Sequence, residues 1–268
     1  MMSRLVLLTG ASGTLGRLLA PRLSSKGYAL RLSDINPFPD ALPQDAEFVA
    51  ADLVDEPAVR KIVADTDGIV HLGGIGLEKP FRTIIDANIL GLTYLFEAAR
   101  RSHQRIVVAS SNHTVGFYER GETLTATDPM RPDGYYGLSK AYGELLGRMM
   151  FDKHGIESVH LRIGSCLPKP TEARHLSTWL SHDDLERLIV AALEAETTGH
   201  AVVWGVSANT RSWWKSDDAA HIGYTPHDDA ERFAPLPKEG DPVTRRFQGG
   251  DLAAQGYTKD GDWPSEGR

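Results

Sequence analysis

Residues 5–16 read LVLLTGASGTLG, and this stretch decides the fold. An apolar strand pattern over residues 5–9 runs directly into three glycines, and a helical pattern follows. In a strand, turn and helix of this kind, Gly10 permits the tight turn, Gly13 lets the backbone approach a pyrophosphate, and Gly16 lets the helix pack close to the strand. The N-terminus of the helix then receives the phosphate charge. The stretch predicts a phosphate cradle, and a glycine-rich turn without a ligand is the alternative.

An acidic residue follows at the end of the second predicted strand. An apolar strand pattern covers residues 29–32, and Asp34 comes eighteen residues after Gly16. A carboxylate at this place hydrogen-bonds both hydroxyls of an adenosine ribose and repels a 2'-phosphate. The glycine spacing is GxxGxxG and not GxGxxG, so the context of strand, helix and acid carries the interpretation. We predict that the chain binds NAD and not NADP.

Composition and charge narrow the class of protein. A chain of 268 residues with 41% hydrophobic residues can bury one substantial core. The net charge of -7, without a cluster of Lys or Arg, argues against a nucleic-acid surface or a polybasic membrane contact. The apolar run at residues 5–8 is too short for a signal peptide, and no stretch is long enough to span a bilayer, so we expect a cytoplasmic protein. With Cys166 as the single cysteine and no CxxC, HExxH or clustered ligand set, we predict no internal disulfide and no metal.

Strand and helix patterns alternate along the chain, which indicates an α/β fold with a doubly wound, Rossmann-type parallel sheet of six or seven strands. The predicted strands cover residues 5–9, 29–34, 47–50, 68–71, 105–110, 158–163 and 201–204. The predicted helices cover residues 15–26, 57–64, 81–102, 136–154 and a stretch from Ser181 to about Ala195 that opens with a capping box.

We expect residues 1–165 to form the NAD-binding domain. Residues 166–268 then form a small substrate-binding region with elements that return to the sheet and a polar tail, of which residues 258–268 are loosely held. Ligands of such sheets bind beyond the carboxyl ends of the strands. The segments that line the predicted pocket are therefore 72–80, 111–116 and 164–181.

A tyrosine and a lysine four residues apart are the predicted acid and base. Tyr136 and Lys140 lie at the start of a helical pattern and therefore on one face, where phenol and ammonium converge. A free tyrosine has a pKa of about 10, but a neighbouring Lys⁺ and a positive nicotinamide ring both favour the phenolate. Tyr136 then takes a proton from a substrate hydroxyl as hydride leaves for NAD. Tyr135 lies off this face and is interpreted as a packing residue.

The loop after the fifth strand supplies the third catalytic candidate. Ser111 is expected to hold the reacting oxygen beside the tyrosine. Asn112 and His113 offer further hydrogen bonds to a substrate, and ordinary turn chemistry is the alternative for both. Asn88, in the middle of a predicted helix, is expected to hold a water that relays protons from Lys140, or else to be merely solvated.

Two more strand ends complete the cofactor side. Asp52 and Leu53 follow the third strand and are expected to reach the adenine. Leu72, Gly73 and Gly74 follow the fourth strand and are expected to pass under the ribose and the pyrophosphate, because both glycines permit close approach of the backbone.

In their order along residues 4–165, the glycine turn, Asp34, Asp52-Leu53, Ser111 and Tyr136-Gly-Leu-Ser-Lys140 resemble the extended short-chain dehydrogenase/reductase family. Finer motifs resemble the uronate dehydrogenases of that family along nearly the whole chain. They include His71-Leu-Gly-Gly-Ile75, Glu78-Lys-Pro-Phe81, Ala109-Ser-Ser-Asn-His-Thr114, Arg131-Pro-Asp-Gly134, Arg162-Ile-Gly-Ser-Cys166 and Arg246-Phe-Gln-Gly-Gly250. The resemblance implies NAD-dependent oxidation of D-glucuronate or D-galacturonate at the anomeric carbon, which yields an aldarolactone. A uronate is then the small-molecule partner, and we expect a homo-oligomer.

The resemblance also implies roles for single residues. Arg174 matches the arginine that binds the substrate carboxylate, and its planar guanidinium suits a carboxylate because it can make two parallel bonds. A surface pair with Glu172 is the alternative. Gly76 departs from the pattern, which has a serine that touches the sugar. The tryptophans interpreted as packing residues are Trp179, Trp204, Trp213 and Trp214.

The candidate site divides into three sets. The predicted catalytic residues are Ser111, Tyr136 and Lys140. The predicted cofactor-binding residues are Gly10, Gly13, Thr14, Leu15, Gly16, Asp34, Asp52, Leu53, Leu72, Gly73, Gly74, Lys140 and Cys166. The predicted substrate-binding residues are Ile75, Gly76, Ser111, Asn112, His113, Tyr136, Ser165 and Arg174.

Two other functions use the same fold. A nucleotide-sugar epimerase or dehydratase would need the same Ser, Tyr and Lys, but the region after Gly164 is short for holding a nucleotide diphosphate. A non-catalytic NAD-sensing protein would not need all three residues.

Overall fold

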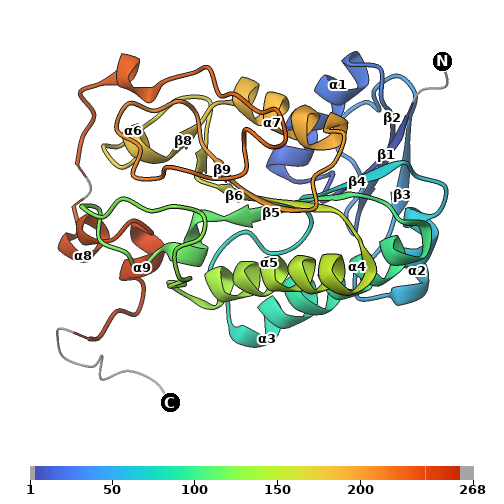
Figure 1. Ribbon diagram of the computed structural model, residues 1–268, viewed down its shortest axis with the longest axis horizontal. Helices are drawn as coiled ribbons and strands as arrows, with labels where there is room; N and C mark the ends of the chain where they lie inside the picture. The colour runs from blue at the N-terminus through green and yellow to red at the C-terminus, as the bar shows by residue number, and fades with distance from the viewer. Residues whose placement is uncertain (1–3, 239, 260–268) are drawn as a thin grey trace.

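The computed structural model describes residues 4–238 and 240–259. In this part of the chain, seven strands form one sheet in the order β3-β2-β1-β4-β5-β6-β9 (Figure 1). They are β1 (Leu5–Thr9), β2 (Ala29–Asp34), β3 (Ala46–Ala50), β4 (Gly68–His71), β5 (Ile106–Ser111), β6 (Ser158–Ile163) and β9 (His200–Gly205). Every neighbouring pair is parallel, which confirms the predicted α/β fold.

Helices cover both faces of the sheet because both faces of its central strands are apolar. On one face, Val6 and Leu8 of β1 belong to a buried cluster with Leu188 of α7 (His182–Glu194), and α1 (Thr14–Ser25) packs there as well. On the other face, Leu7 packs with Phe96 under α2 (Glu56–Val63), α4 (Gly91–Ser102) and α5 (Tyr135–His154). Figure 1 shows the two helical layers above and below the sheet. None of the helices in the described part of the chain is long and apolar enough to cross a membrane.

The strand order reverses beside β1, which has β2 on one side and β4 on the other. Chain connections leave this point in opposite directions, so the loops after β1 and β4 diverge and leave a crevice. The same edge of the sheet carries the end of β5. The sequence pattern places Ser111 in the loop after the fifth strand. In the structure, Ser111 is the last residue of β5.

The helical stretch predicted at residues 81–102 is divided in the structure. A short helix, α3 (Phe81–Ile84), passes into a π-helical turn, η1 (Ile85–Leu90), which continues as α4. Single π turns inside α-helices often lie at functional sites. This one contains Asn88, whose side chain bonds the backbone of Ile75.

The region after residue 165 supplies a sheet edge and a cap over the carboxyl ends of the strands. Together with η2 (Asn112–Val115), which follows β5, the cap contains β7 (Ser165–Cys166), α6 (His175–Thr178), β8 (Trp179–Leu180), η3 (Ala230–Phe233), α8 (Pro242–Arg246) and α9 (Asp251–Ala254). Of the tail predicted to be loosely held, residues 260–268 lie outside the described residues.

The tryptophans pack as expected. Trp179, Trp204 and Trp214 are all less than 5% exposed, and Trp213 packs beside Trp214. Trp204 and Trp214 belong to a buried cluster with Tyr118 that joins the end of the sheet to the cap.

Candidate active site

A cavity of about 640 Å³ opens where β1, β4, β5 and β6 end. Most of the predicted site residues line it, namely Gly10, Gly13, Thr14, Leu15, Gly16, Leu72, Gly73, Gly74, Ile75, Gly76, Ser111, Asn112, His113, Tyr136, Lys140 and Cys166. The predicted residues outside its lining are Asp34, Asp52, Leu53, Ser165 and Arg174. Burial raises the pKa of the Cys166 thiol to about 12, so this side chain is a neutral part of the wall.

The glycine turn has the shape that a dinucleotide requires. Gly10 has a φ of +69°, and a Cβ atom there would lie 2.6 Å from the backbone nitrogen of Gly73. A Cβ atom on Gly16 would collide with the Gly10 carbonyl. Gly13 is the N-cap of α1 and has no side chain to bond the N–H groups of the first turn. The cavity wall formed by Gly13 and Thr14 therefore presents positively polarised backbone, which fits a pyrophosphate.

Asp34 ends β2 beside this turn. Its carboxylate accepts hydrogen bonds from the backbone nitrogens of Ser12 at 3.2 Å and Asn36 at 3.0 Å, so its position is held from both sides. The side chain of Leu53 lies under Gly73, where a Cβ atom would be 3.0 Å from its Cδ1. The ribose and adenine contacts of these residues stay predictions.

The three predicted catalytic residues converge at the end of β5. Tyr136 is 8% exposed, and the Nζ atom of Lys140 lies 5.6 Å from the centre of its ring. Lys140 also donates to the backbone oxygen of Ala109 at 2.8 Å. The Ser111 hydroxyl bonds the Tyr136 phenol and accepts from the backbone nitrogen of His113 at 3.2 Å. The arrangement places one phenol between a hydroxyl and an ammonium.

The pKa values of this pair differ from the sequence expectation. Burial raises the pKa of Tyr136, the bond with Ser111 lowers it only in part, and Asp133 raises it further. Burial lowers the pKa of Lys140 to about 8. Within the chain itself, the pKa of the Tyr136 phenol is not lowered toward neutral pH, because burial disfavours its charged form. We expect the positive nicotinamide ring to favour the phenolate when the cofactor binds.

Asn88 is buried, so the expectation that it is merely solvated is wrong, and its role in a water relay stays a prediction. It is 4% exposed, its Oδ1 accepts from the Ile75 nitrogen at 2.7 Å, and its Nδ2 donates to the Ile75 oxygen at 3.0 Å and to Ser139 at 3.0 Å. It ties the segment after β4 to α5. A Cβ atom on Gly74 would lie 2.6 Å from the Asn88 oxygen, which explains the glycine there.

His113 and Asp133 form a buried pair at the edge of the cavity. The Nδ1 atom of His113 lies 2.7 Å from Asp133 Oδ2, and the His113 ring meets the Tyr136 ring edge-on at 5.7 Å. Three glycines enclose the Asp133 carboxylate so closely that a Cβ atom on any of them would crowd it, namely Gly116, Gly137 and Gly249. Asp133 fixes the orientation of the imidazole, and a contact of His113 with a substrate hydroxyl stays a prediction. Sequence reasoning missed Asp133, and the glycines that surround it are the signal that could have found it.

Arg174 does not line the cavity but lies against one of its lining residues, Asn112, and is buried, with an exposure of 8%. Its Nη1 donates to the Ser165 hydroxyl at 3.1 Å, and its Nε donates to the backbone oxygen of Gln248 at 2.8 Å. With the Asn112 amide oriented so that both its ends are satisfied, Asn112 accepts from Arg174 Nη2 at 3.0 Å and donates to Ile163. Because Arg174 is buried, the alternative of an exposed surface pair with Glu172 does not describe its environment.

Glu78 is a second residue that sequence reasoning missed. The N-cap of α5 is Gly134, which has no side chain to cap the helix. Glu78 takes over this task from a distant segment, since its carboxylate accepts from the backbone nitrogens of Tyr135 at 3.0 Å and Tyr136 at 2.9 Å. A glycine directly before a helix is the signal that a cap must come from elsewhere. Tyr135 itself is half exposed and packs on Phe81 with ring centres 5.0 Å apart.

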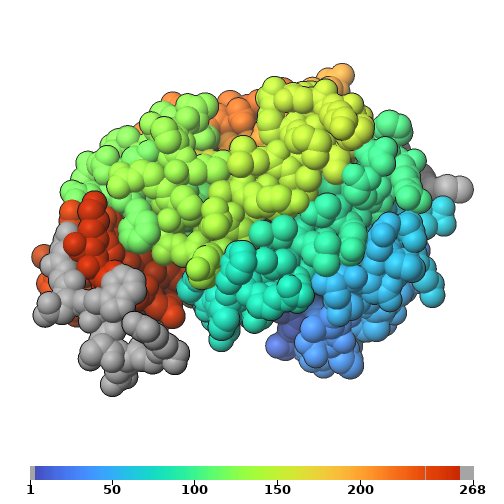
Figure 2. All heavy atoms as spheres, turned by 90° about the horizontal axis from the view of Figure 1, so that it is seen from below, coloured from blue at the N-terminus to red at the C-terminus, as the bar shows by residue number. Residues whose placement is uncertain are grey.

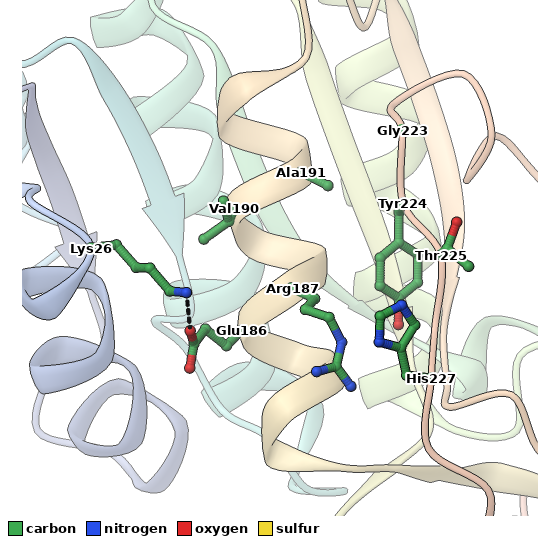
Figure 3. A pocket seen from close by; sticks show the side chains of 9 residues that line it. All are labelled: Lys26, Glu186, Arg187, Val190, Ala191, Gly223, Tyr224, Thr225 and His227. Atoms are coloured by element: carbon green, nitrogen blue, oxygen red, sulfur yellow. Dashed lines mark ion pairs between the residues drawn. The ribbon is translucent and has the colours of Figure 1, made fainter.

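A smaller hollow of about 360 Å³ lies on the outer side of α7 (Figure 3). Its charged groups are engaged within the protein: Lys26 pairs with Glu186 at 3.3 Å, and Arg187 pairs with Asp184 at 2.6 Å. Its lining contains Gly223 but not the strand, three-glycine turn and helix of the main cavity, so we assign it no ligand. No group of His, Cys, Asp and Glu suited to hold a metal ion occurs in residues 4–238 and 240–259.

Comparisons with known proteins agree with this geometry. The chain matches the NAD dependent epimerase/dehydratase family over residues 6–232. A uronate dehydrogenase from Agrobacterium fabrum (strain C58) is 50% identical and covers 91% of this chain and 95% of its own length. A uronate dehydrogenase from Pseudomonas syringae pv. tomato is 45% identical, with 94% of each chain covered.

A solved structure of uronate dehydrogenase from Agrobacterium tumefaciens, a tyrosine-to-alanine mutant complexed with NAD, is also similar. Its TM-score is 0.89 at 47% identity, over 94% of this chain and 97% of that chain. The family match, the sequence identities and the shared fold confirm the resemblance seen in the sequence. The chain belongs to the NAD dependent epimerase/dehydratase family and, within it, to the uronate dehydrogenases.

Proposed function

We propose that the chain oxidises a hexuronate, D-glucuronate or D-galacturonate, at the anomeric carbon with NAD⁺ as acceptor and releases an aldarolactone. The observation that carries the proposal is the buried guanidinium of Arg174, which bonds Asn112 in the wall of the cavity that Ser111, Tyr136 and Lys140 also line. A buried cation beside a cavity favours a substrate with a carboxylate, because a neutral sugar cannot balance the charge.

The side chains of the cavity support one proton transfer. Bound NAD⁺ supplies the acceptor for the hydride of the anomeric C–H bond. Ser111 holds the anomeric hydroxyl beside Tyr136, and Tyr136 takes its proton. The base is the Tyr136 phenolate, which becomes a neutral phenol when it takes the proton. Lys140 carries a positive charge below about pH 8 and stabilises the phenolate before this transfer. Glu78 keeps Tyr136 in place by bonding its backbone nitrogen.

The polar groups opposite this tyrosine orient the sugar. Arg174 binds the carboxylate, while Ser165, Asn112 and His113 bond hydroxyl groups. Gly76 lies on the wall with open space around its Cα, so the sugar receives no hydroxyl contact from this position. Orientation by fixed groups removes the entropic cost of aligning the C–H bond with its acceptor.

An assay of NADH formation tests the proposal. Glucuronate and galacturonate are expected to reduce NAD⁺, whereas glucose, galactose and UDP-glucose are expected to give little or no NADH. Turnover of UDP-glucose without turnover of uronates would favour a nucleotide-sugar epimerase or dehydratase. Binding of NAD⁺ without turnover of any sugar would favour a non-catalytic NAD-sensing protein. A homo-oligomer and a cytoplasmic location are further predictions, which light scattering and cell fractionation test.

A further inference from the structure

A short segment near the C-terminus forms a wall along Arg174. The backbone oxygen of Gln248 accepts from Arg174 Nε at 2.8 Å. Gly250 has a φ of +66°, and a Cβ atom there would lie 2.9 Å from both Cδ and Nε of the arginine. Figure 2 shows this red C-terminal segment packed against the green residues that follow β5. The path of residues 247–250 therefore decides where the guanidinium points.

Gln248 holds this path through bonds that do not reach the cavity. It is fully buried. Its side-chain oxygen accepts from Trp214 Nε1 at 2.7 Å, and its side-chain nitrogen donates to the backbone oxygens of Glu119 at 3.1 Å and Glu122 at 2.8 Å. Its backbone nitrogen donates to the Tyr118 oxygen at 2.8 Å. Because these bonds fix both the side chain and the backbone nitrogen of Gln248, its backbone oxygen has one orientation. In that orientation it accepts the bond from Arg174.

The other end of this network is equally rigid. Trp214 stacks on Trp204 with ring centres 5.0 Å apart, and the Arg162 guanidinium lies 5.0 Å over Trp204. Arg162 pairs with the buried Glu144 at 2.8 Å, and Glu144 accepts from Ser110 at 2.6 Å. Buried contacts thus run continuously from the end of β5 to Gln248.

We infer that Gln248 is a positioning residue that determines specificity for a carboxylate substrate by acting through Arg174. This inference rests on the proposed function. Gln248 fixes the direction of the Arg174 Nε–H bond, and Nη1 and Nη2 donate to Ser165 and Asn112, so the plane of the guanidinium is set through all three of its nitrogens. A loosened Arg174 keeps its charge but loses the geometry for a two-bond contact with a carboxylate. Hydride and proton transfer take place elsewhere in the cavity and do not depend on this bond.

Steady-state kinetics of Gln248→Met provide the first test, since methionine keeps the volume and removes the three side-chain bonds. The KM for the uronate is expected to rise about five- to tenfold, while kcat stays within about threefold and the KM for NAD⁺ is unchanged. The matched control is Gln104→Met. Gln104 is a buried amide before β5, and its nitrogen donates to Val63 and to Thr66 at 2.6–3.0 Å. This control is expected to lower Tm without raising the KM for the uronate.

A double-mutant cycle separates positioning from general damage. In an Arg174→Ala background, Gln248→Met is expected to leave the KM for the uronate unchanged, because the residue through which it acts is gone. The inference is overturned if Gln248→Met raises KM by the same factor with and without Arg174, or if kcat and KM for NAD⁺ change as strongly as the KM for the uronate.

A measurement independent of activity keeps this inference separate from the proposed function. In ¹H–¹⁵N spectra of arginine Nε groups, the signal that Arg174→Ala removes is expected to show slow solvent exchange in the wild type and faster exchange in Gln248→Met. Gln104→Met is expected to leave it unchanged. A protected Nε–H without uronate turnover in the wild type contradicts the proposed function and supports the positioning role. Equal exchange in wild type and Gln248→Met contradicts the positioning role whatever the substrate.

Discussion

The two halves of the cavity are built in different ways. The cofactor half is formed by backbone, with Gly10, Gly13 and Gly16 close together in the sequence. The substrate half is formed by side chains from separate segments, where Ser165, Asn112 and the backbone of Gln248 meet around Arg174. A site formed by backbone can be recognised in the sequence from the spacing of its glycines. A site formed by side chains cannot, because it depends on which segments fold against each other.

The two halves also differ in the positive groups that they offer to a negatively charged ligand. The cofactor half offers partial charges of a helix N-terminus, which are present in any sequence that folds this way. The substrate half contains a full charge on a buried guanidinium, which needs partners with matched geometry. Substitutions should therefore change different kinetic constants in the two halves, and the predictions below use this difference.

The largest effect is expected at the junction of the halves. Tyr136→Phe removes the proton acceptor and keeps the ring, so kcat is expected to fall about 10²- to 10⁴-fold while NAD⁺ affinity is unchanged. The control is Tyr135→Phe, since this neighbour is half exposed and does not line the cavity. Stopped-flow or steady-state NADH formation measures the loss. Turnover of Tyr136→Phe within a few-fold of the wild type would reject the tyrosine as base.

A smaller effect is expected in the substrate half. Arg174→Ala should raise the KM for the uronate about 10- to 100-fold, with a smaller fall in kcat and an unchanged KM for NAD⁺. Arg174→Lys should recover only part of the loss, since a point charge does not reproduce the fork. Glu172→Gln serves as control and should leave the KM for the uronate unchanged. If the KM for the uronate rises steeply in Glu172→Gln and is normal in Arg174→Ala, the proposed role of Arg174 in binding the carboxylate is wrong.

In the cofactor half, the sharpest change concerns the choice of dinucleotide. The wild type is expected to prefer NAD⁺ strongly, and Asp34→Ser should narrow the preference over NADP⁺ about tenfold by removing both the ribose bonds and the repulsion of a 2'-phosphate. The ratio of kcat/KM for the two cofactors is the measurement. The KM for the uronate should not change, because Asp34 lies on β2 away from the substrate end. Equal use of both cofactors by the wild type would refute the role of Asp34.

The last effect concerns stability and not a kinetic constant, at the junction of the halves. Burial lowers the pKa of Lys140 to about 8, so the unfolded chain binds more protons than the folded chain between about pH 8 and pH 10.5. The contribution of Lys140 to stability therefore rises as pH increases through this window. The unfolding free energy of Lys140→Met minus that of the wild type should fall by about 3 kcal/mol from pH 7 to pH 11.

Urea unfolding at several pH values, without cofactor, measures this difference, in which the other titrating groups cancel. A difference that stays constant with pH would show that Lys140 is not desolvated. Lys140→Met should also lower kcat and weaken NAD⁺ binding, so the lysine is kept for function at a cost in stability.

Several features could be predicted from the sequence because they depend on neighbours along the chain. Strand β2 and strand β6 agree with their predicted limits, and the glycine turn, Asp34 and the Tyr136–Lys140 pair lie where their spacing indicated. Arg174 was assigned by family resemblance alone. Its burial and its bond to Gln248 join segments that no local pattern connects.

The sequence by itself determined the parallel sheet, the phosphate cradle and the face of α5 that carries the acid and base, because hydrophobic period, glycine freedom and helical repeat act over a few residues. Only the tertiary structure decided the role of Asn88 as a tie to Ile75, the capping of α5 by Glu78 and the wall that Gln248 forms beside Arg174. It also decided the direction of the Tyr136 pKa, since burial depends on all segments that surround the phenol. These features arise from contacts between residues far apart in the chain, and their energies exist only once the whole core has formed.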